Sequence, residues 1–177
     1  MPASLLMSNA LAVERAHLSN QDEFSVAAMA TNLNQLLFQF SKPGQFITAF
    51  FSVLDRNNGT LEYVNAGHEP PIMINNGQLV VYEQTADVVL GVIDDVQYQS
   101  TIINLSPGSM VCIFTDGITE AFNKSGEQFG ERRLVTLLRR FGSEPARVIC
   151  DRIKMELMQY RGDTLQSDDI TAVVFKV

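Results

Sequence analysis

Two short acidic segments contain the residues of this sequence best suited to chemistry. Asp116-Gly117 follows the apolar run Met110 to Phe114, and Asp168-Asp169 precedes the apolar run Thr171 to Val177. A carboxylate at the end of a buried strand is costly to desolvate unless something compensates its charge. Hard divalent cations do so, because they take oxygen ligands from Asp and Glu. If the two acidic strand ends meet, they form a candidate metal site.

Each acidic segment also has a simpler interpretation. Asp116 either binds a metal, with Gly117 allowing close approach of the backbone, or it caps a tight turn. Asp168 and Asp169 repel each other unless a cation or solvent separates them. Because side chains alternate along a strand, we expect one of the two to face the site. We assign Asp168 as that ligand, since it is further from the apolar run, and keep Asp169 as the second choice.

Glu120 and His68 are two further candidates. Glu120 follows Asp116 by one helical turn, so both side chains can reach the same cleft. It either contacts an additional ion or a metal-bound water, or it serves as a cap or surface residue. His68 lies in a Gly-His-Glu-Pro-Pro loop and could act as a ligand or a proton carrier, because histidine titrates near neutrality. We favour the alternative, in which His68 bonds to backbone and holds the Pro-Pro segment in place.

Composition excludes several function classes. The formal charge of −7 and the pI of about 4.7 argue against a nucleic-acid partner, which would require a basic face. The chain has no Gly-x-Ser-x-Gly elbow, no Walker glycine loop and no dinucleotide fingerprint. With only two histidines, a His-rich zinc site is not expected. An oxygen-ligand site for Mg²⁺ or Mn²⁺ is the remaining interpretation.

The cysteines and the hydropathy pattern bear on the compartment. Cys112 and Cys150 lie in apolar segments, and their spacing is not that of zinc ligands. We interpret both as small core residues. The sequence shows no Lys/Arg-led signal peptide and no apolar run long enough to span a bilayer. We therefore expect a soluble cytoplasmic domain with no membrane partner.

The elements that must position these residues form an α+β layered domain. At 177 residues, one domain is the default. Turn signals at Asn57-Asn58-Gly59 and Asn75-Asn76-Gly77 predict two β-hairpins. Apolar periodicity predicts helices at about residues 2–18, 22–41 (capped by Asp22), 132–141 and from 143–145 to 160. It predicts strands at 46–55, 61–65, 72–74, 79–82, 98–105, 110–114 and 171–177. Segregated helices and hairpins are typical of α+β architecture.

An ordered set of short motifs runs along the whole chain. Its members are Met1-Pro-Ala-Ser-Leu-Leu-Met, Phe46-Ile-Thr-Ala, Asn65-Ala-Gly-His68-Glu-Pro-Pro, Leu90-Gly91-Val92, Phe114-Thr-Asp116-Gly-Ile-Thr-Glu-Ala, Phe129-Gly130 and Asp168-Asp-Ile-Thr. In motifs and in their order the sequence resembles the SpoIIE-type branch of the PPM (type 2C-like) metal-dependent serine/threonine phosphatases. The order makes the resemblance specific, although each motif alone is weak.

This resemblance implies a single PPM-type domain over residues 1–177, an α-β-β-α sandwich of antiparallel sheets flanked by helix pairs. Helices at about 2–41 would correspond to the branch's regulatory switch helices, and the sandwich with its second helix pair to 45–177. Asp116 and Asp168 would be metal ligands of a binuclear Mn²⁺ or Mg²⁺ centre, in a cleft lined by Gly67 and His68. Two metals would activate a water that attacks the phosphorus of phosphoserine or phosphothreonine. Substrates in this branch are typically small regulatory proteins, often anti-anti-sigma (STAS) domains, and a sensor or receiver domain would stand upstream.

One departure from the family pattern leads to further expectations. The family's first helix is preceded by a Gly-Asp-x-Ser-Gly-x-Gly turn, whose aspartate bridges both metals, and here the sequence begins after that turn. We therefore expect an N-terminally truncated domain with half a metal site, little activity in isolation and an exposed sheet edge that favours a homodimer. The competing functional classes are a non-catalytic phosphatase-like binding module and an unrelated metal-dependent hydrolase on a similar layered fold.

Overall fold

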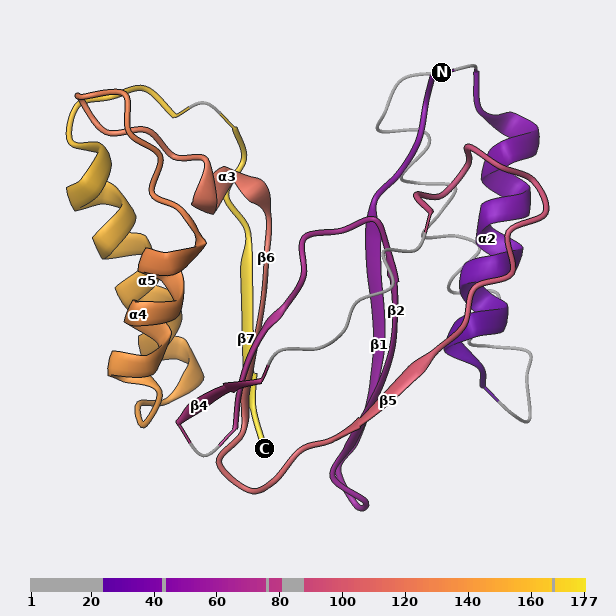
Figure 1. Cartoon of the computed structure of the whole chain (residues 1–177), viewed down its shortest axis with the longest axis horizontal. Helices are drawn as coiled ribbons and strands as arrows, with labels where there is room; N and C mark the ends of the chain where they lie inside the picture. Colours follow the sequence, from indigo (N-terminus) through magenta and orange to yellow (C-terminus); the bar gives the residue numbers. More distant parts are fainter. Residues whose placement is uncertain (1–23, 43, 76, 81–87, 167) are drawn as a thin grey trace. The chain divides into compact units, whose positions relative to one another are not determined.

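A computed structural model describes residues 24–42, 44–75, 77–80, 88–166 and 168–177, and it divides the chain into two compact units (Figure 1). The first comprises Met1–His68 with Gln84–Asn104, and the second comprises Glu69–Glu83 with Leu105–Val177. The helix predicted at 2–18, the proposed cap Asp22 and the end of the strand predicted at 79–82 lie outside the described residues. No helix in the described ranges is both long and apolar enough to cross a membrane.

The first unit consists of a helix on a three-stranded antiparallel sheet. Helix α2 (Val26–Phe40) covers a sheet of order β1-β2-β5, formed by β1 (Ala49–Asp55), β2 (Thr60–Ala66) and β5 (Thr101–Asn104). Its core gathers one face of α2 against β2 and two loop residues, and contains Val26, Ala30, Leu33, Leu37, Val64, Ala66, Leu90 and Tyr98. The face of α2 that packs on the sheet is therefore apolar.

Helix α2 begins later than its predicted position. Ser25 is the N-cap, because its Oγ accepts a hydrogen bond of 3.2 Å from the backbone N–H of Ala28. The prediction that Asp22 caps the helix is thus wrong. Phe40 ends the helix just before Lys42-Pro43-Gly44, as the sequence indicated.

The first predicted hairpin is confirmed, and the strand predicted at 98–105 is shorter than expected. Asp55 Oδ1 accepts hydrogen bonds from the backbone N–H groups of Asn57 (2.8 Å) and Asn58 (3.1 Å), which closes the β1–β2 turn. Strand β5 begins only at Thr101. Tyr98 does not join the ladder, because its backbone N–H donates to Thr31 Oγ1 on α2 at 3.1 Å.

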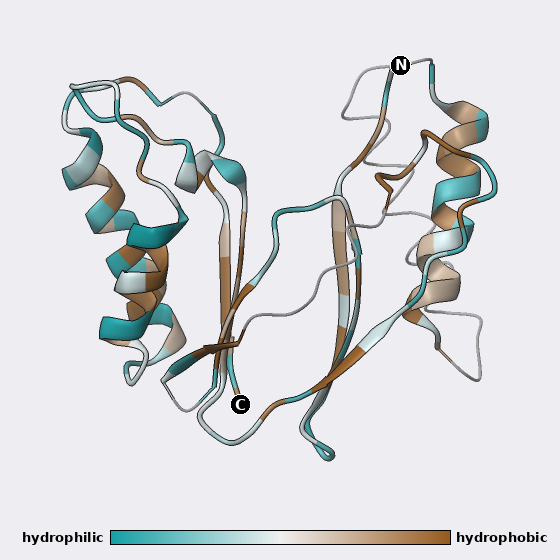
Figure 2. Ribbon diagram, viewed as in Figure 1, coloured by the Kyte–Doolittle hydropathy of each residue, from teal (hydrophilic) through white to brown (hydrophobic). Residues whose placement is uncertain are grey.

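The second unit is a four-stranded antiparallel sheet with helices packed against it. The sheet has the order β4-β3-β6-β7. It is formed by β3 (Ile72–Asn75), β4 (Gln78–Val80), β6 (Met110–Phe114) and β7 (Ala172–Lys176), and the helices are α3 (Asp116–Thr119), α4 (Glu131–Phe141) and α5 (Ala146–Arg161). Figure 2 shows that α4 and α5 turn their apolar residues toward the strands.

The core of this unit explains why its strands are so apolar. Buried residues of β3 and β6 pack against Leu134 and Leu138 of α4 and against Ile149 and Ile153 of α5. Strand β6 is covered by the helices and flanked by β3 and β7 on its two edges. Four of the five residues of β6 are buried, and Thr115 and Asp116 follow directly after this strand. A well-packed strand therefore fixes the position of both residues.

Candidate metal centre

The two acidic segments lie side by side in the second unit. Strand β6 pairs with β7 in antiparallel register up to Phe114 opposite Ala172. Just beyond this pair, the backbone N–H of Thr115 donates to the carbonyl oxygen of Thr171 at 3.1 Å. The exit of one strand is thus tied to the entrance of the other, as the metal hypothesis required.

The side chain of Thr115 adds two more links between the segments. Its Oγ1 accepts a hydrogen bond from the backbone N–H of Thr171 at 3.0 Å and donates one to the carbonyl oxygen of Asp169 at 3.2 Å. Sequence reasoning did not single out Thr115, although a hydroxyl next to an acidic strand end is a detectable signal. Thr115 is a positioning residue for both acidic segments.

Gly117 is required where it stands because the partner backbone approaches it closely. Gly117 is buried in α3, and a Cβ at this position would overlap the carbonyl oxygen of Asp169. The prediction that Gly117 allows backbone approach to a metal stays untested, and the structure shows a close approach of another kind. The backbone that approaches is that of the second acidic segment.

Asp116 and Glu120 occupy the two ends of the short helix α3. Both residues are exposed, and the backbone N–H of Glu120 donates to the carbonyl oxygen of Asp116 at 2.8 Å. They are therefore one helical turn apart, as predicted. Within the described ranges, no hydrogen bond or ion pair engages the Asp116 carboxylate, which leaves it available to a cation.

Asp168 and Asp169 lie in the bend before β7, both exposed to solvent. The alternation argument used to choose between them does not apply, because β7 begins only at Ala172. Asp168 Oδ1 accepts a hydrogen bond from the backbone N–H of Asp169 at 2.7 Å, and the carbonyl oxygen of Asp168 accepts one from Gln166 Nε2 at 2.7 Å. The Asp168 carboxylate is thus oriented locally, with Oδ2 still available.

Gly67 and His68 belong to the first unit and lie at the end of β2. The buried side chain of Asn65 clamps this turn: its Oδ1 accepts from the backbone N–H of His68 at 2.8 Å, and its Nδ2 donates to the carbonyl oxygen of His68 at 3.0 Å. Gly67 has a φ of +73°, and a Cβ there would overlap the side chain of Val89. Asn65 therefore holds the backbone of this turn. Sequence reasoning included Asn65 in a motif but did not predict this role for its side chain.

The donor set fits a hard divalent cation in its chemistry, although it is small. Asp116, Asp168 and Asp169 offer carboxylate oxygens on segments tied together by backbone contacts, which suits Mg²⁺ or Mn²⁺. Among the residues that the structure describes, no group of three or more His, Cys, Asp or Glu side chains gathers as a metal site. Asp116, Asp168 and Asp169 therefore remain candidate ligands that do not make a complete metal site among the described residues.

Comparison with known proteins identifies the class of this fold. The chain superposes on the SiaA-PP2C domain of Pseudomonas aeruginosa with a TM-score of 0.84 at 23% sequence identity, covering 100% of this chain and 71% of that one. The fold is thus that of a PP2C-type (PPM) phosphatase domain, which confirms the predicted α+β class of antiparallel sheets with helices.

The family follows from the sequence comparison. The family model for Stage II sporulation protein E (SpoIIE) matches residues 1–177, and the chain belongs to this family. Protein IcfG of Synechocystis sp. (strain ATCC 27184 / PCC 6803 / Kazusa) is 32% identical over 152 residues, which cover 85% of this chain and 24% of the relative. Phosphoserine phosphatase RsbU of Bacillus subtilis (strain 168) is 29% identical over 147 residues, which cover 82% of this chain and 43% of the relative. The chain therefore spans less than half the length of either relative.

Proposed function

We propose that this chain is a serine/threonine protein phosphatase domain that hydrolyses phosphoserine or phosphothreonine on a regulatory protein, with Mn²⁺ or Mg²⁺ as cofactor. The observation that carries the proposal is the junction of Thr115–Gly117 with Asp168–Thr171, which brings two carboxylate-bearing segments to one end of the second sheet. Membership in the SpoIIE family and the relation to RsbU, a phosphoserine phosphatase, support it.

The metal assignment rests on residue chemistry and on relatives. Asp116 and Asp168 would be the ligands, with Gly117 beside them and with Asp169 and Glu120 as weaker candidates. When bound, the cation would supply Lewis-acid polarisation of a phosphoryl oxygen and an activated water. Among structural relatives, the phosphatase domain of Bacillus subtilis SpoIIE was presoaked in Mn, and RsbX was solved in complex with magnesium.

The chain's own residues would hold and orient the acidic groups. Thr115 fixes the backbone of Asp169 and Thr171 through its hydroxyl, and the backbone N–H of Asp169 orients the Asp168 carboxylate. Preorganised ligands of this kind lose less entropy when a cation binds. We also propose that the phosphorylated partner is a small regulatory protein, such as a STAS-type one, and that an upstream sensor or receiver domain controls activity. Self-association of the chain stays a prediction.

A second candidate function is a non-catalytic, phosphatase-like binding module. It is favoured by the small donor set, because the described residues contain no cluster of three metal-ligating side chains. Both candidates predict partner binding, and they differ in whether the chain binds a metal through Asp116.

Calorimetric titration with Mn²⁺ separates the two functions. The phosphatase proposal predicts binding that is lost in Asp116→Asn and retained in Asp151→Asn, a matched change at an exposed aspartate on α5. Phosphate release from a phosphoserine peptide is measured in parallel, and even slow hydrolysis is decisive if it requires both Mn²⁺ and Asp116. Absence of any Asp116-dependent Mn²⁺ binding would contradict the phosphatase proposal and favour the binding module.

A further inference from the structure

Helices α4 and α5 form a basic region in an acidic chain. Residues 131–161 contain eight of the 13 Lys and Arg residues and only four of the 20 Asp and Glu residues. Their formal charge is +4; since the whole chain carries −7, the remainder carries −11. Charge asymmetry of this size along one chain favours an anionic partner at the helices.

A pocket of about 540 Å³ opens on this region. Arg132, Arg133 and Arg140 of α4 contribute its cationic groups, and Leu137 and Phe141 contribute apolar surface. The pocket therefore combines positive charge with a place for an apolar side chain.

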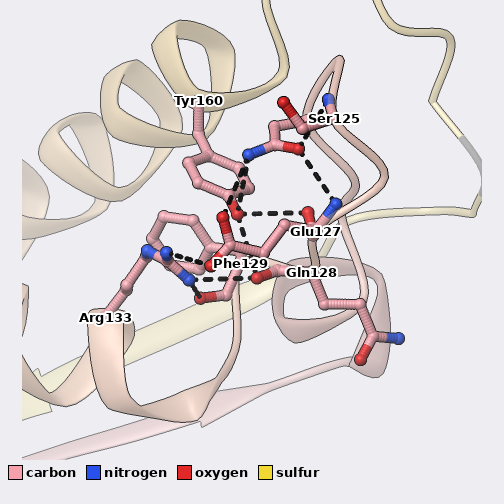
Figure 3. Close-up of polar contacts among 7 residues, drawn as sticks. Ser125, Glu127, Gln128, Phe129, Arg133 and Tyr160 are labelled. Carbon is pink, nitrogen blue, oxygen red and sulfur yellow. Dashed lines mark hydrogen bonds and ion pairs between the residues drawn. The ribbon is translucent and has the colours of Figure 1, made fainter.

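The loop beside the pocket is held by a network of polar contacts (Figure 3). Arg133 donates to the carbonyl oxygens of Gln128 (3.0 Å) and Phe129 (2.8 Å), and its guanidinium pairs with the Glu127 carboxylate at 2.7 Å. The hydrogen bond from Arg133 lowers the pKa of the Glu127 carboxyl group. Tyr160 of α5 donates its hydroxyl to the same loop, so the rim of the pocket is anchored to both helices.

Several other arginines of the region have no ion-pair partner among the described residues. Ion pairs among the described residues engage Lys124 and Arg133, and none engages Arg132, Arg140 or Arg152. The guanidinium groups of Arg140 and Arg152 lie 5.1 and 4.8 Å from the centre of the Phe141 ring. Two like charges near one ring repel each other, and a carboxylate paired with Arg140 in the pocket would reduce that repulsion.

We propose that this α4–α5 pocket docks an acidic peptide segment of a partner protein, at a surface separate from the candidate metal centre. Carboxylates of the segment would pair with Arg132 and Arg140, and an apolar side chain would pack on Leu137 and Phe141. Guanidinium groups suit this task because they bind carboxylates in a bidentate manner.

The same residues argue against other anionic partners. Glu127 and Glu156 also line the pocket and repel any anion there, so the carboxylates of the segment would have to meet Arg132 and Arg140 specifically. A nucleic acid or a lipid bilayer extends beyond the pocket and would in addition meet the −11 charge of the remaining chain. The apolar face of α4 lies in the core, with Leu134 and Leu138 fully buried, and is not available for insertion into lipid.

Fluorescence anisotropy with a labelled peptide of repeated Asp-Glu-Leu-Glu units tests the proposal on the full chain. We expect saturable binding that weakens with added NaCl, because exposed charges are screened. Arg132→Glu/Arg140→Glu should weaken binding about tenfold, the sum expected for two exposed charge pairs. The matched control, Arg139→Glu/Arg147→Glu, makes the same charge change at exposed positions that do not line the pocket.

Several outcomes would overturn the proposal. These are no binding by the wild type, equal weakening by both double variants, equal binding of a peptide with Asn and Gln in place of the acids, or preference for heparin or phosphatidylglycerol vesicles over the peptide. Arg132→Gln/Arg140→Gln, which removes charge without reversing it, repeats the test, and circular dichroism checks that each variant is folded. The readout needs no metal or hydrolysis, so its failure leaves the phosphatase proposal untouched.

Discussion

The α-carbon of Gly117 faces the carbonyl oxygen of Asp169 so closely that a Cβ at position 117 would overlap it. This contact joins the residue after one acidic strand end to the second acidic segment. Because both sides of the contact are backbone, neither can move aside as a flexible side chain would. The geometry of the candidate metal centre therefore depends on the absence of a side chain at position 117.

Gly117→Ala should destabilise the fold by about 2 kcal/mol, in the range typical of overpacking. Helix propensity alone predicts the opposite sign, since Ala is favoured over Gly by about 1 kcal/mol inside a helix. Urea unfolding monitored by circular dichroism measures the change. Gly108→Ala is the comparison, because a Cβ there meets no atom within 4 Å and its cost comes only from a φ of +89°. An unchanged or increased stability of Gly117→Ala would mean that the Asp169 carbonyl is not fixed against it.

Thr115→Val should cost about 1–2 kcal/mol, because the substitution keeps the shape and removes both hydrogen bonds of Oγ1. It should also weaken Mn²⁺ binding in calorimetry, since the Asp168–Asp169 segment loses its anchor. Thr136→Val is a matched control: the Thr136 hydroxyl bonds only within its own helix, to the carbonyl oxygen of Arg132 at 2.8 Å. Equal metal affinity in both variants would exclude a positioning role for Thr115.

Asn34→Ala should destabilise the first unit by about 3 kcal/mol. The fully buried Asn34 amide accepts from the backbone N–H of Gly91 at 2.8 Å and donates to the carbonyl oxygens of Ile93 and Asp94 at 2.8 and 3.2 Å. Its loss leaves the buried backbone N–H of Gly91 unpaired and releases the carbonyl oxygens of Ile93 and Asp94. Asn32→Ala, at an exposed position of the same helix, should stay within about 0.5 kcal/mol of the wild type. Thermal unfolding measures the change. If both variants lower the melting temperature equally, the Asn34 hydrogen bonds do not hold the Leu90–Asp94 segment.

Cys112 should resist alkylation in the folded protein, whereas Cys150 should react. Burial raises the pKa of the Cys112 thiol to about 12, and its side chain is inaccessible in the core. Since the thiolate is the nucleophile, almost none is present at pH 8. Iodoacetamide labelling followed by peptide mass spectrometry measures both sites, with a urea-unfolded sample as the control in which both must react. Rapid labelling of Cys112 under native conditions would show that the β6 core opens readily.

The sequence by itself determined the elements whose signals are local. Strand β6 occupies the predicted residues 110–114, the Asn57–Gly59 turn closes the predicted hairpin, and Phe40 and Phe141 end their helices before Pro-Gly and Gly signals. Hydrophobic periodicity and turn chemistry act within a few residues, which makes such features readable along the chain. The acidic pairs were readable for the same reason, as carboxylates next to apolar runs.

Only the tertiary structure decided how those residues are used. Strand pairing of β6 with β7 places Thr115 beside Asp169, although 54 positions separate them in sequence. The same long-range packing removed Tyr98 from its predicted strand by giving its N–H to Thr31, and it put Asp168 in a bend where strand alternation has no meaning. Such outcomes depend on which distant groups satisfy a backbone hydrogen bond or fill a space, and no local pattern encodes that choice.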